Sequence, residues 1–134
     1  MSGKSTQTPD LHARSKELTE KIIGCAYTVA NELGCGFLEK VYENALAYEL
    51  RKQGLQVEQQ KPLNVYYDGT IVGVYFADIV VNAEVLLELK CAKCFEETHL
   101  AQCLNYLRGC GMSVALLINF GAPRVEIKRI INDR

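Results

Sequence analysis

Three ionisable residues interrupt two stretches of otherwise apolar sequence, and their spacing could bring them together. Asp78 is the only charged residue of 74–81, and Glu88 and Lys90 are the only charged residues of 85–91. Because side chains two apart on a strand project from the same face, Glu88 and Lys90 are expected side by side. With a three-residue turn at 82–84, Asp78 would lie opposite Glu88, with β-carbons about 4.5–5.5 Å apart. A two-residue turn would put the two acids on opposite faces, so the register tests the idea.

Two carboxylates at this distance repel each other unless a cation lies between them. Hard divalent cations such as Mg²⁺ take oxygen ligands and keep several waters, which leaves positions for a phosphate and a nucleophile. Such a cation lowers the pKa of a bound water, and a neighbouring lysine could orient that water or neutralise developing charge. The alternative is a solvated strand face. Apolar residues on both faces of 85–91 favour a buried strand instead, where charges need partners or a metal.

A predicted helix over 96–108 carries a line of polar side chains beside an apolar stripe. His99, Gln102 and Tyr106 form this line at helical spacing. A polar line of this kind is usually the boundary of a surface helix. Gln102 and Tyr106 are four residues apart, however, so both could reach a shared site over the sheet.

The sequence has six cysteines, a high number for its length. Cys25 and Cys103 fall on apolar helical faces, where cysteine behaves as a small hydrophobic residue. Cys91 and Cys94 form a Cys-x-x-Cys pair that, with His99 and Cys103, could hold zinc or an iron–sulfur cluster. Only one such pair is present, and Cys103 belongs to a buried stripe. We therefore expect reduced, metal-free thiols.

Periodicity and turn signals predict the elements that must position these residues. A first helix is expected from Thr8-Pro9-Asp10 to about residue 33, and a second over 38–53. Asp68-Gly69 predicts a hairpin, and Pro62 is expected to break or restart the strand that it interrupts. Strands are predicted over 55–60, 63–67, 71–81, 85–91, 113–119 and 124–130. This order predicts an α/β fold with a mixed central sheet flanked by helices.

Length and charge limit the classes of function. The 134 residues predict a single domain over 11–134, preceded by a flexible segment 1–10. A net charge of −1 does not provide the basic surface of an autonomous DNA-binding domain, but a bound cation would supply positive charge at a phosphate. Segment 1–10 is polar, and no window approaches the roughly 18 apolar residues that would suggest a membrane span. We expect a cytoplasmic protein that does not contact a membrane.

Four motifs together resemble a known family. Residues 36–42, Gly-Phe-Leu-Glu-Lys-Val-Tyr, match the signature of the GxxExxY family, a small-protein branch of the PD-(D/E)xK nuclease superfamily. Asp78 followed by Glu88-Leu89-Lys90 is similar to the Asp…Glu-x-Lys core of the superfamily. Gln102 to Tyr106 resembles the Gln-x-x-x-Tyr element of its RecB-type members, and 117–121 is similar to the family's closing strand. The resemblance covers about residues 16–131, and the motifs occur in the correct order.

The resemblance implies a restriction-endonuclease-like core with two N-terminal helices. It also implies a metal-dependent nuclease that hydrolyses nucleic-acid phosphodiester bonds, with DNA as the expected substrate. Mg²⁺ or Mn²⁺ would be bound by Asp78, Glu88 and the carbonyl of Leu89. Glu39 would be the helix-borne acid that completes the site, whereas Glu43, one turn later, is interpreted as part of a solvated acidic edge.

The resemblance assigns Lys90 to assist the water, and Gln102 and Tyr106 to steady the phosphate or Lys90. Two features depart from the pattern. Ala77 stands where the superfamily name has proline, and no basic cluster marks a path for nucleic acid. The alternative function is a catalytically silent binding or assembly module. It would act through a protein partner, a second copy of the chain or a nucleic acid. The choice between DNA and RNA, and between endo- and exonuclease action, stays open.

Overall fold

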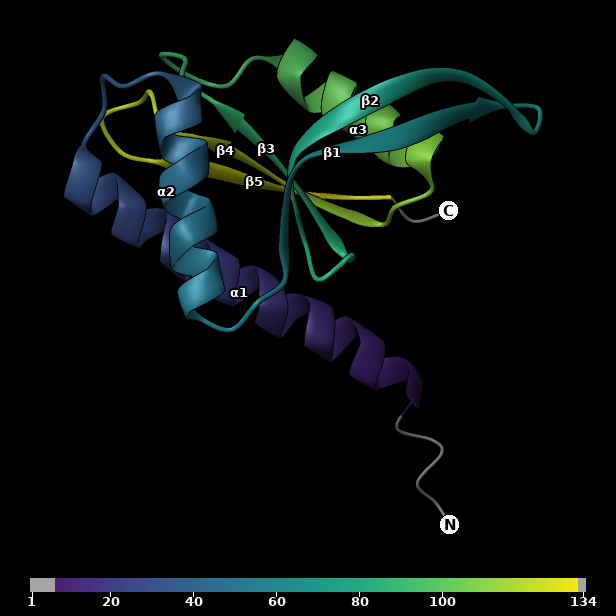
Figure 1. Cartoon of the computed structure of the whole chain (residues 1–134), viewed down its shortest axis with the longest axis horizontal. Coiled ribbons are helices and arrows are strands. Elements are labelled where there is room, and N and C mark those ends of the chain that lie inside the picture. Colours follow the sequence, from purple (N-terminus) through teal and green to yellow (C-terminus); the bar gives the residue numbers. More distant parts are fainter. Residues whose placement is uncertain (1–6, 133–134) are drawn as a thin grey trace.

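The computed structural model describes residues 7–132, with side chains from residue 15 onward (Figure 1). Residues 1–6 of the predicted flexible segment lie outside this range, as does the side chain of Thr8, the predicted helix cap. Residues 7–10 begin the first helix. The elements in chain order are α1 (Gln7–Leu33), α2 (Glu39–Lys52), β1 (Val57–Tyr67), β2 (Thr70–Val81), β3 (Val85–Lys90), α3 (Glu97–Cys110), β4 (Val114–Asn119) and β5 (Glu126–Ile131).

The five strands form one mixed sheet in the order β1-β2-β3-β4-β5. β3 and β4 are parallel, and the other neighbours are antiparallel. A parallel pair needs a crossover connection, which α3 provides. β3 therefore lies at the centre of the sheet, as its continuous apolar sequence indicates. The prediction of an α/β fold with a mixed central sheet and two N-terminal helices is confirmed.

Helices cover both faces of the sheet. On one face, α1 and α2 bury an apolar stripe that includes Ile22 and Leu46, and this stripe packs against alternate strand residues such as Leu87. On the other face, α3 buries Cys103 and Leu107. The alternation of strand side chains between the two clusters follows from the two-residue period of a strand. The loop that ends β3 and the start of α2 lie at the same end of the molecule (Figure 1).

β1 and β2 form a long hairpin that projects from the body of the domain (Figure 1). Its turn contains Asp68 and Gly69, both with positive φ (53° and 75°), which confirms the predicted hairpin. The predicted break at Pro62 is wrong, because β1 continues through Pro62, which pairs with Phe76. β1 is an edge strand, and edge strands tolerate a residue without a backbone N–H.

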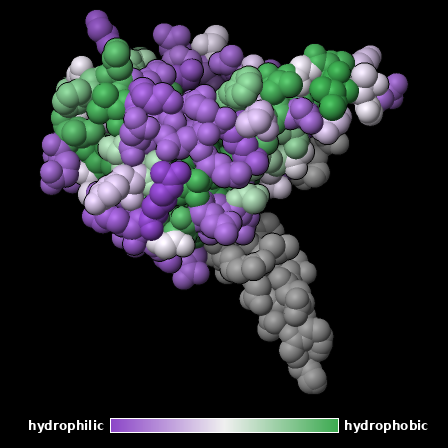
Figure 2. All heavy atoms as spheres, viewed as in Figure 1, coloured by the Kyte–Doolittle hydropathy of each residue, from purple (hydrophilic) through white to green (hydrophobic). Residues whose placement is uncertain are grey.

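The projecting part of the hairpin exposes apolar side chains (Figure 2). We call residues 62–77 the hairpin arm; Asp68 is its only charged residue. Large hydrophobic side chains of the arm that are more than half exposed are Tyr66, Tyr67, Ile71, Val72, Val74 and Phe76. The opposite face packs on α3, where Val65 closely approaches Gly109. None of the helices within residues 7–132 combines the length and apolar character needed to cross a membrane.

Candidate active site

The register between β2 and β3 is the one that the candidate site requires. Ile79 pairs with Leu87 and Val81 with Val85, so the turn contains three residues, 82–84. Asn82 and Ala83 adopt positive φ values of 52° and 56° in this turn. The predicted three-residue turn is therefore confirmed, and the same register places Asp78 opposite Glu88, one position beyond the last ladder pair.

Asp78 lies where β2 begins to separate from β3. Its Oδ2 accepts a hydrogen bond from the backbone N–H of Leu89 at 2.8 Å. The Asp78 side chain thus bonds a strand group where the regular β2–β3 ladder has ended. Its Oδ1 accepts from Gln60 Nε2 at 3.3 Å. Gln60 itself has a φ of 50°, which is rare for a residue with a side chain and marks an irregular point in β1.

Burial raises the pKa of Asp78, and the nearby Glu43 raises it further. The hydrogen bonds from Leu89 and Gln60, together with the positive charge of Lys90, act in the opposite direction. Burial dominates, because it removes water from the charged form of the carboxylate. Asp78 is therefore a carboxylate whose negative charge is incompletely balanced by the protein.

The negative charge of Glu88 is also incompletely balanced by the protein, and the effect on its pKa is large. Burial raises the pKa of Glu88 to about 7, while Lys90 lowers it and Glu39 raises it. Its Oε2 is buried and has no hydrogen-bond partner among the described residues. An unpartnered buried carboxylate oxygen is costly, and a bound cation is one way to satisfy it. Lys90 thus acts electrostatically on both Asp78 and Glu88.

Two acids of α2 approach the strands at different points. Glu39 is exposed and accepts a hydrogen bond from the backbone N–H of Cys91 at 3.2 Å. It thereby contacts the end of β3, and its charge influences Glu88. Glu43 is closer to Asp78, whose pKa it raises. Either Glu39 or Glu43 could therefore be the helix-borne acid that completes the site.

The interpretation of Glu43 as part of a solvated edge is wrong, because only 3% of this residue is exposed. Its carboxylate accepts hydrogen bonds from Gln59 at 2.8 Å and from Gln60 at 2.9 Å, and forms an ion pair with Lys40 at 3.2 Å. Gln60 Nε2 also contacts Asp78, so one amide links the two acids. Sequence spacing missed Glu43 because its burial depends on contact between α2 and β1. The two glutamines that bond it lie 16 and 17 residues further along the chain, so no local pattern signals the contact.

The three residues of the polar line on α3 have different surroundings. His99 Nδ1 accepts from the backbone N–H of Glu96 in a helix-capping arrangement. Tyr106 stacks on Tyr75 with ring centroids 3.7 Å apart. Gln102 is exposed. Among residues 15–132, no hydrogen bond joins Gln102 or Tyr106 to the acids of the site.

Cys103 is the α3 residue whose electrostatic surroundings include the site. Burial raises the pKa of its thiol to about 12, with a further increase from Glu88 and a decrease from Lys90. The thiol is therefore neutral at ordinary pH. It covers the face of the sheet from which Glu88 projects, and it helps to exclude water there.

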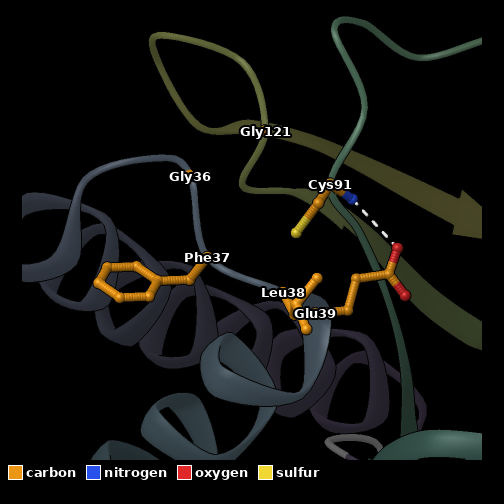
Figure 3. A pocket seen from close by; sticks show the side chains of 6 residues that line it. All are labelled: Gly36, Phe37, Leu38, Glu39, Cys91 and Gly121. Carbon is orange, nitrogen blue, oxygen red and sulfur yellow. Dashed lines mark hydrogen bonds between the residues drawn. The ribbon is translucent and has the colours of Figure 1, made fainter.

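A pocket of about 530 Å³ adjoins the site at the end of β3 (Figure 3). Its lining residues are Gly36, Phe37, Leu38, Glu39, Cys91 and Gly121. The Cys91 thiol points into the pocket, whereas the Cys91 N–H bonds the Glu39 carboxylate (Figure 3). Burial raises the pKa of the Cys91 thiol, and Glu39 raises it further. The pocket therefore shares Glu39 with the candidate site.

Tyr42 fixes one wall of this pocket. It is fully buried, its hydroxyl donates to the carbonyl of Gly34, and it accepts from the backbone N–H of Phe37 at 3.3 Å. Its ring stacks on Phe120 at 4.6 Å. In the Gly-x-x-Glu-x-x-Tyr signature, the glutamate, Glu39, therefore contacts the end of β3. The tyrosine, Tyr42, holds the loop before α2.

All six cysteines lie in the described range and none is paired. Cys94 is exposed, and Cys91 is partly buried. Within residues 15–132, no group of three or more histidine, cysteine or acidic side chains is arranged to hold a metal ion. Asp78 and Glu88 remain as a pair of carboxylates, with the carbonyl of Leu89 between Glu88 and Lys90 in sequence. Such a small ligand set fits Mg²⁺, which keeps several of its waters.

The fold and the site together define a small restriction-endonuclease-like α/β domain. Its central antiparallel strands carry an Asp and a Glu-x-Lys, and a helix supplies further acids. Residues 16–130 match the sequence profile of the PD-(D/E)XK nuclease superfamily, and the chain belongs to this superfamily. The predicted superfamily is therefore confirmed over most of the chain. No curated protein and no solved structure is significantly similar to it.

Proposed function

We propose that the chain is a metal-dependent nuclease of the GxxExxY type that hydrolyses phosphodiester bonds of nucleic acid, with DNA as the expected substrate. The observation that carries the proposal is the β2–β3 register, which sets Asp78 opposite Glu88 when it is continued by one position, together with the hydrogen bond from Leu89 N–H to Asp78. Burial raises both pKa values, and one oxygen of Glu88 has no partner. Membership of the PD-(D/E)XK nuclease superfamily supports the same reaction class.

The residues present fit a divalent cation of the Mg²⁺ or Mn²⁺ kind. Asp78, Glu88 and the carbonyl of Leu89 would hold it, because hard cations prefer oxygen ligands and accept partial coordination by water. When bound, the cation would lower the pKa of a water and balance charge on the phosphate. The cation would add positive charge, beyond that of Lys90, beside two carboxylates whose pKa values burial raises.

Lys90 is the cationic side chain that influences both Asp78 and Glu88. Its ammonium would orient the attacking water and stabilise negative charge that develops on the phosphate. Cys103 and the apolar face of α3 would keep bulk water away, which strengthens these interactions. Gln102, on the exposed side of α3, would approach the phosphate directly. Tyr106 would support the sheet through its stacking on Tyr75.

Glu39 is proposed as the acid that completes the site, because it is the glutamate of the family signature and contacts the end of β3. Glu43 is the competing candidate, because Gln60 links it to Asp78. The two differ in exposure: Glu39 is open to solvent, and Glu43 is 3% exposed. Glu39 can therefore bind a metal or a water without first breaking a buried network.

A second function is favoured by the hairpin arm. Its exposed apolar side chains and single charge suit contact with a protein partner or a second copy of the chain better than contact with phosphates. In this case the domain would be a binding or assembly module with a silent site. We also propose a cytoplasmic location, which is where its six unpaired cysteines would remain reduced.

A panel of DNA and RNA substrates, incubated with Mg²⁺ or Mn²⁺, tests the enzyme proposal. Cleavage is expected for the unsubstituted protein and is expected to be lost with Asp78→Asn. Asp68→Asn is the matched control, because this exposed acid lies in the turn of the hairpin arm. Absence of both divalent-metal binding and cleavage across the panel would reject the enzyme and leave the module.

A further inference from the structure

The backbone that leaves β3 is held by a neighbouring segment. β3 and β4 pair in parallel as far as Lys90 and Asn119. The N–H of Phe120 then donates to the carbonyl of Lys90 at 2.8 Å. Cys91 and Ala92 follow as irregular backbone. Because they come directly after Lys90, whatever holds them determines the direction in which the end of the site strand points.

The side chain of Asn119 binds both backbone groups of Ala92. Its Oδ1 accepts from Ala92 N at 2.9 Å and from Gly121 N at 3.0 Å. Its Nδ2 donates to Ala92 O at 2.9 Å and to Glu126 Oε1 at 3.0 Å. Asn119 is fully buried, and these four bonds use its two lone pairs and both N–H groups. The amide therefore extends the β3–β4 pairing past Lys90, as a further strand residue would.

Gly121 allows the two backbones to touch. A β-carbon at this position would lie 2.5 Å from Ala92 N and 2.6 Å from Cys91 C. Both neighbours are backbone atoms of the held segment, so they have no flexible end that could move aside. The requirement for glycine here comes from contact, since its φ lies outside the left-handed region. Any side chain would push the segment 91–92 away from β4.

Cys91 is held between Lys90 and Ala92. Its N–H is directed toward Glu39 Oε2 at 3.2 Å, and its thiol points into the pocket (Figure 3). Displacement of the 91–92 backbone would move this N–H and release the Glu39 carboxylate. It would also change the direction from which Lys90 approaches Glu88.

We propose that Asn119 and Gly121 are positioning residues of the candidate nuclease site. They hold the backbone of 90–92 so that Lys90 faces the carboxylates and the Cys91 N–H orients Glu39. The inference rests on the proposed function and extends it from the acids and Lys90 to the segment 119–121. Neither residue contacts the acids directly; each acts through Cys91 and Ala92.

Asn119→Asp provides the first test. Aspartate keeps the shape but has no N–H, so the Ala92 carbonyl loses its donor and a second carboxylate faces Glu126. NMR should show faster amide hydrogen exchange at Cys91 and Ala92. Mn²⁺ affinity of the folded protein, measured by calorimetry, should fall by about 10-fold, the low end of the effect of losing a direct partner of a metal ligand, because Asn119 acts through Ala92 and Cys91. Gly121→Ala should act in the same direction, and Glu126→Gln, which keeps its acceptor, should change neither quantity.

A double variant separates positioning from stability. Asn119→Asp with Glu126→Gln removes the repulsion between carboxylates but leaves the Ala92 carbonyl without its donor. We expect it to recover thermal stability while Mn²⁺ affinity stays low, and it replaces Asn119→Asp if that variant does not fold. Recovery of both quantities, or fast exchange at 91–92 with unchanged Mn²⁺ affinity, would overturn the positioning role. Failure of the proposed function is distinguishable, because the unsubstituted protein would then bind no Mn²⁺, and that result would overturn both proposals.

Discussion

The carboxylate of Asp78 accepts a hydrogen bond from the backbone N–H of Leu89 at 2.8 Å, between two strands that have stopped pairing with each other. This bond places one candidate metal ligand against the peptide that joins the other, Glu88, to the next residue. It also gives Asp78 a structural role, which must be separated from its chemical role in any test by substitution.

Asp78→Asn should separate the two roles. Asparagine keeps an oxygen acceptor for Leu89 N–H, loses only the longer, exposed bond from Gln60, and removes a charge that burial disfavours. We expect thermal stability at neutral pH to be retained or increased, while cleavage and Mn²⁺ binding are lost. Asp78→Ala should also lose about 1–3 kcal/mol of stability, because it leaves Leu89 N–H without its acceptor. Equal destabilisation by both substitutions in thermal melts would contradict this assignment.

Glu88 should make the stability of the metal-free protein depend on pH. Its folded-state pKa of about 7 lies above the ordinary value of 4.5. The stabilisation is therefore fully present below about pH 4.5 and is lost as pH rises through about 7, an effect on the order of 2–4 kcal/mol. Asp78, whose pKa is also raised, acts in the same direction. Chemical denaturation in EDTA at several pH values measures the effect, and Glu88→Gln should flatten the curve. If Glu88→Gln left the pH dependence of the unfolding free energy unchanged, Glu88 would be solvated in the folded protein.

Substitution of the two α2 acids should show which one completes the site. Glu39→Gln removes an exposed charge and should change stability by less than about 0.5 kcal/mol, while it weakens Mn²⁺ binding. Glu43→Gln disrupts a buried carboxylate that accepts from two glutamine side chains, and should cost about 1–3 kcal/mol. Thermal melts and Mn²⁺ calorimetry on both variants give the answer. If only Glu43→Gln weakens Mn²⁺ binding, the roles assigned to the two acids are reversed.

Tyr42→Phe should loosen the loop before α2 without changing the core. The substitution removes a hydroxyl that bonds Gly34 and Phe37 but keeps the ring that stacks on Phe120. We expect a loss of about 1–2 kcal/mol in the free energy of unfolding, with faster amide exchange at Phe37. Tyr48→Phe is the control, because Tyr48 is 63% exposed. Equal effects of the two substitutions would show that the Tyr42 hydroxyl does not hold the loop.

Local rules predicted the register of the two strands that carry Asp78 and Glu88. The spacing of Asp78 and Glu88 around a three-residue turn gave their register, because a strand alternates with a fixed period of two. The apolar sequence of β3 likewise indicated its central position. These features depend on residues close together in the chain, where geometry leaves few alternatives.

Features that depend on contacts between distant segments were not predictable in the same way. The burial of Glu43 requires α2 to lie against β1, and no local pattern indicates that contact. Tyr106 satisfied the spacing for a shared site with Gln102, but the arrangement of the sheet places Tyr75 beneath it. The resemblance includes Asn119 only within the segment 117–121, because its role depends on contact between the end of β4 and the segment 91–92.

Pro62 has a consequence for the behaviour of the protein in concentrated solution. β1 is an edge strand of the sheet, and its second half belongs to the hairpin arm, which is apolar and carries one charge. Long apolar edges recruit strands from other molecules and lead to aggregation, and proteins interrupt them with proline or charge. Pro62, near the middle of this edge, removes a donor that an incoming strand would use. Pro62 therefore opposes the pairing of β1 with a strand of another molecule and favours solubility of the domain.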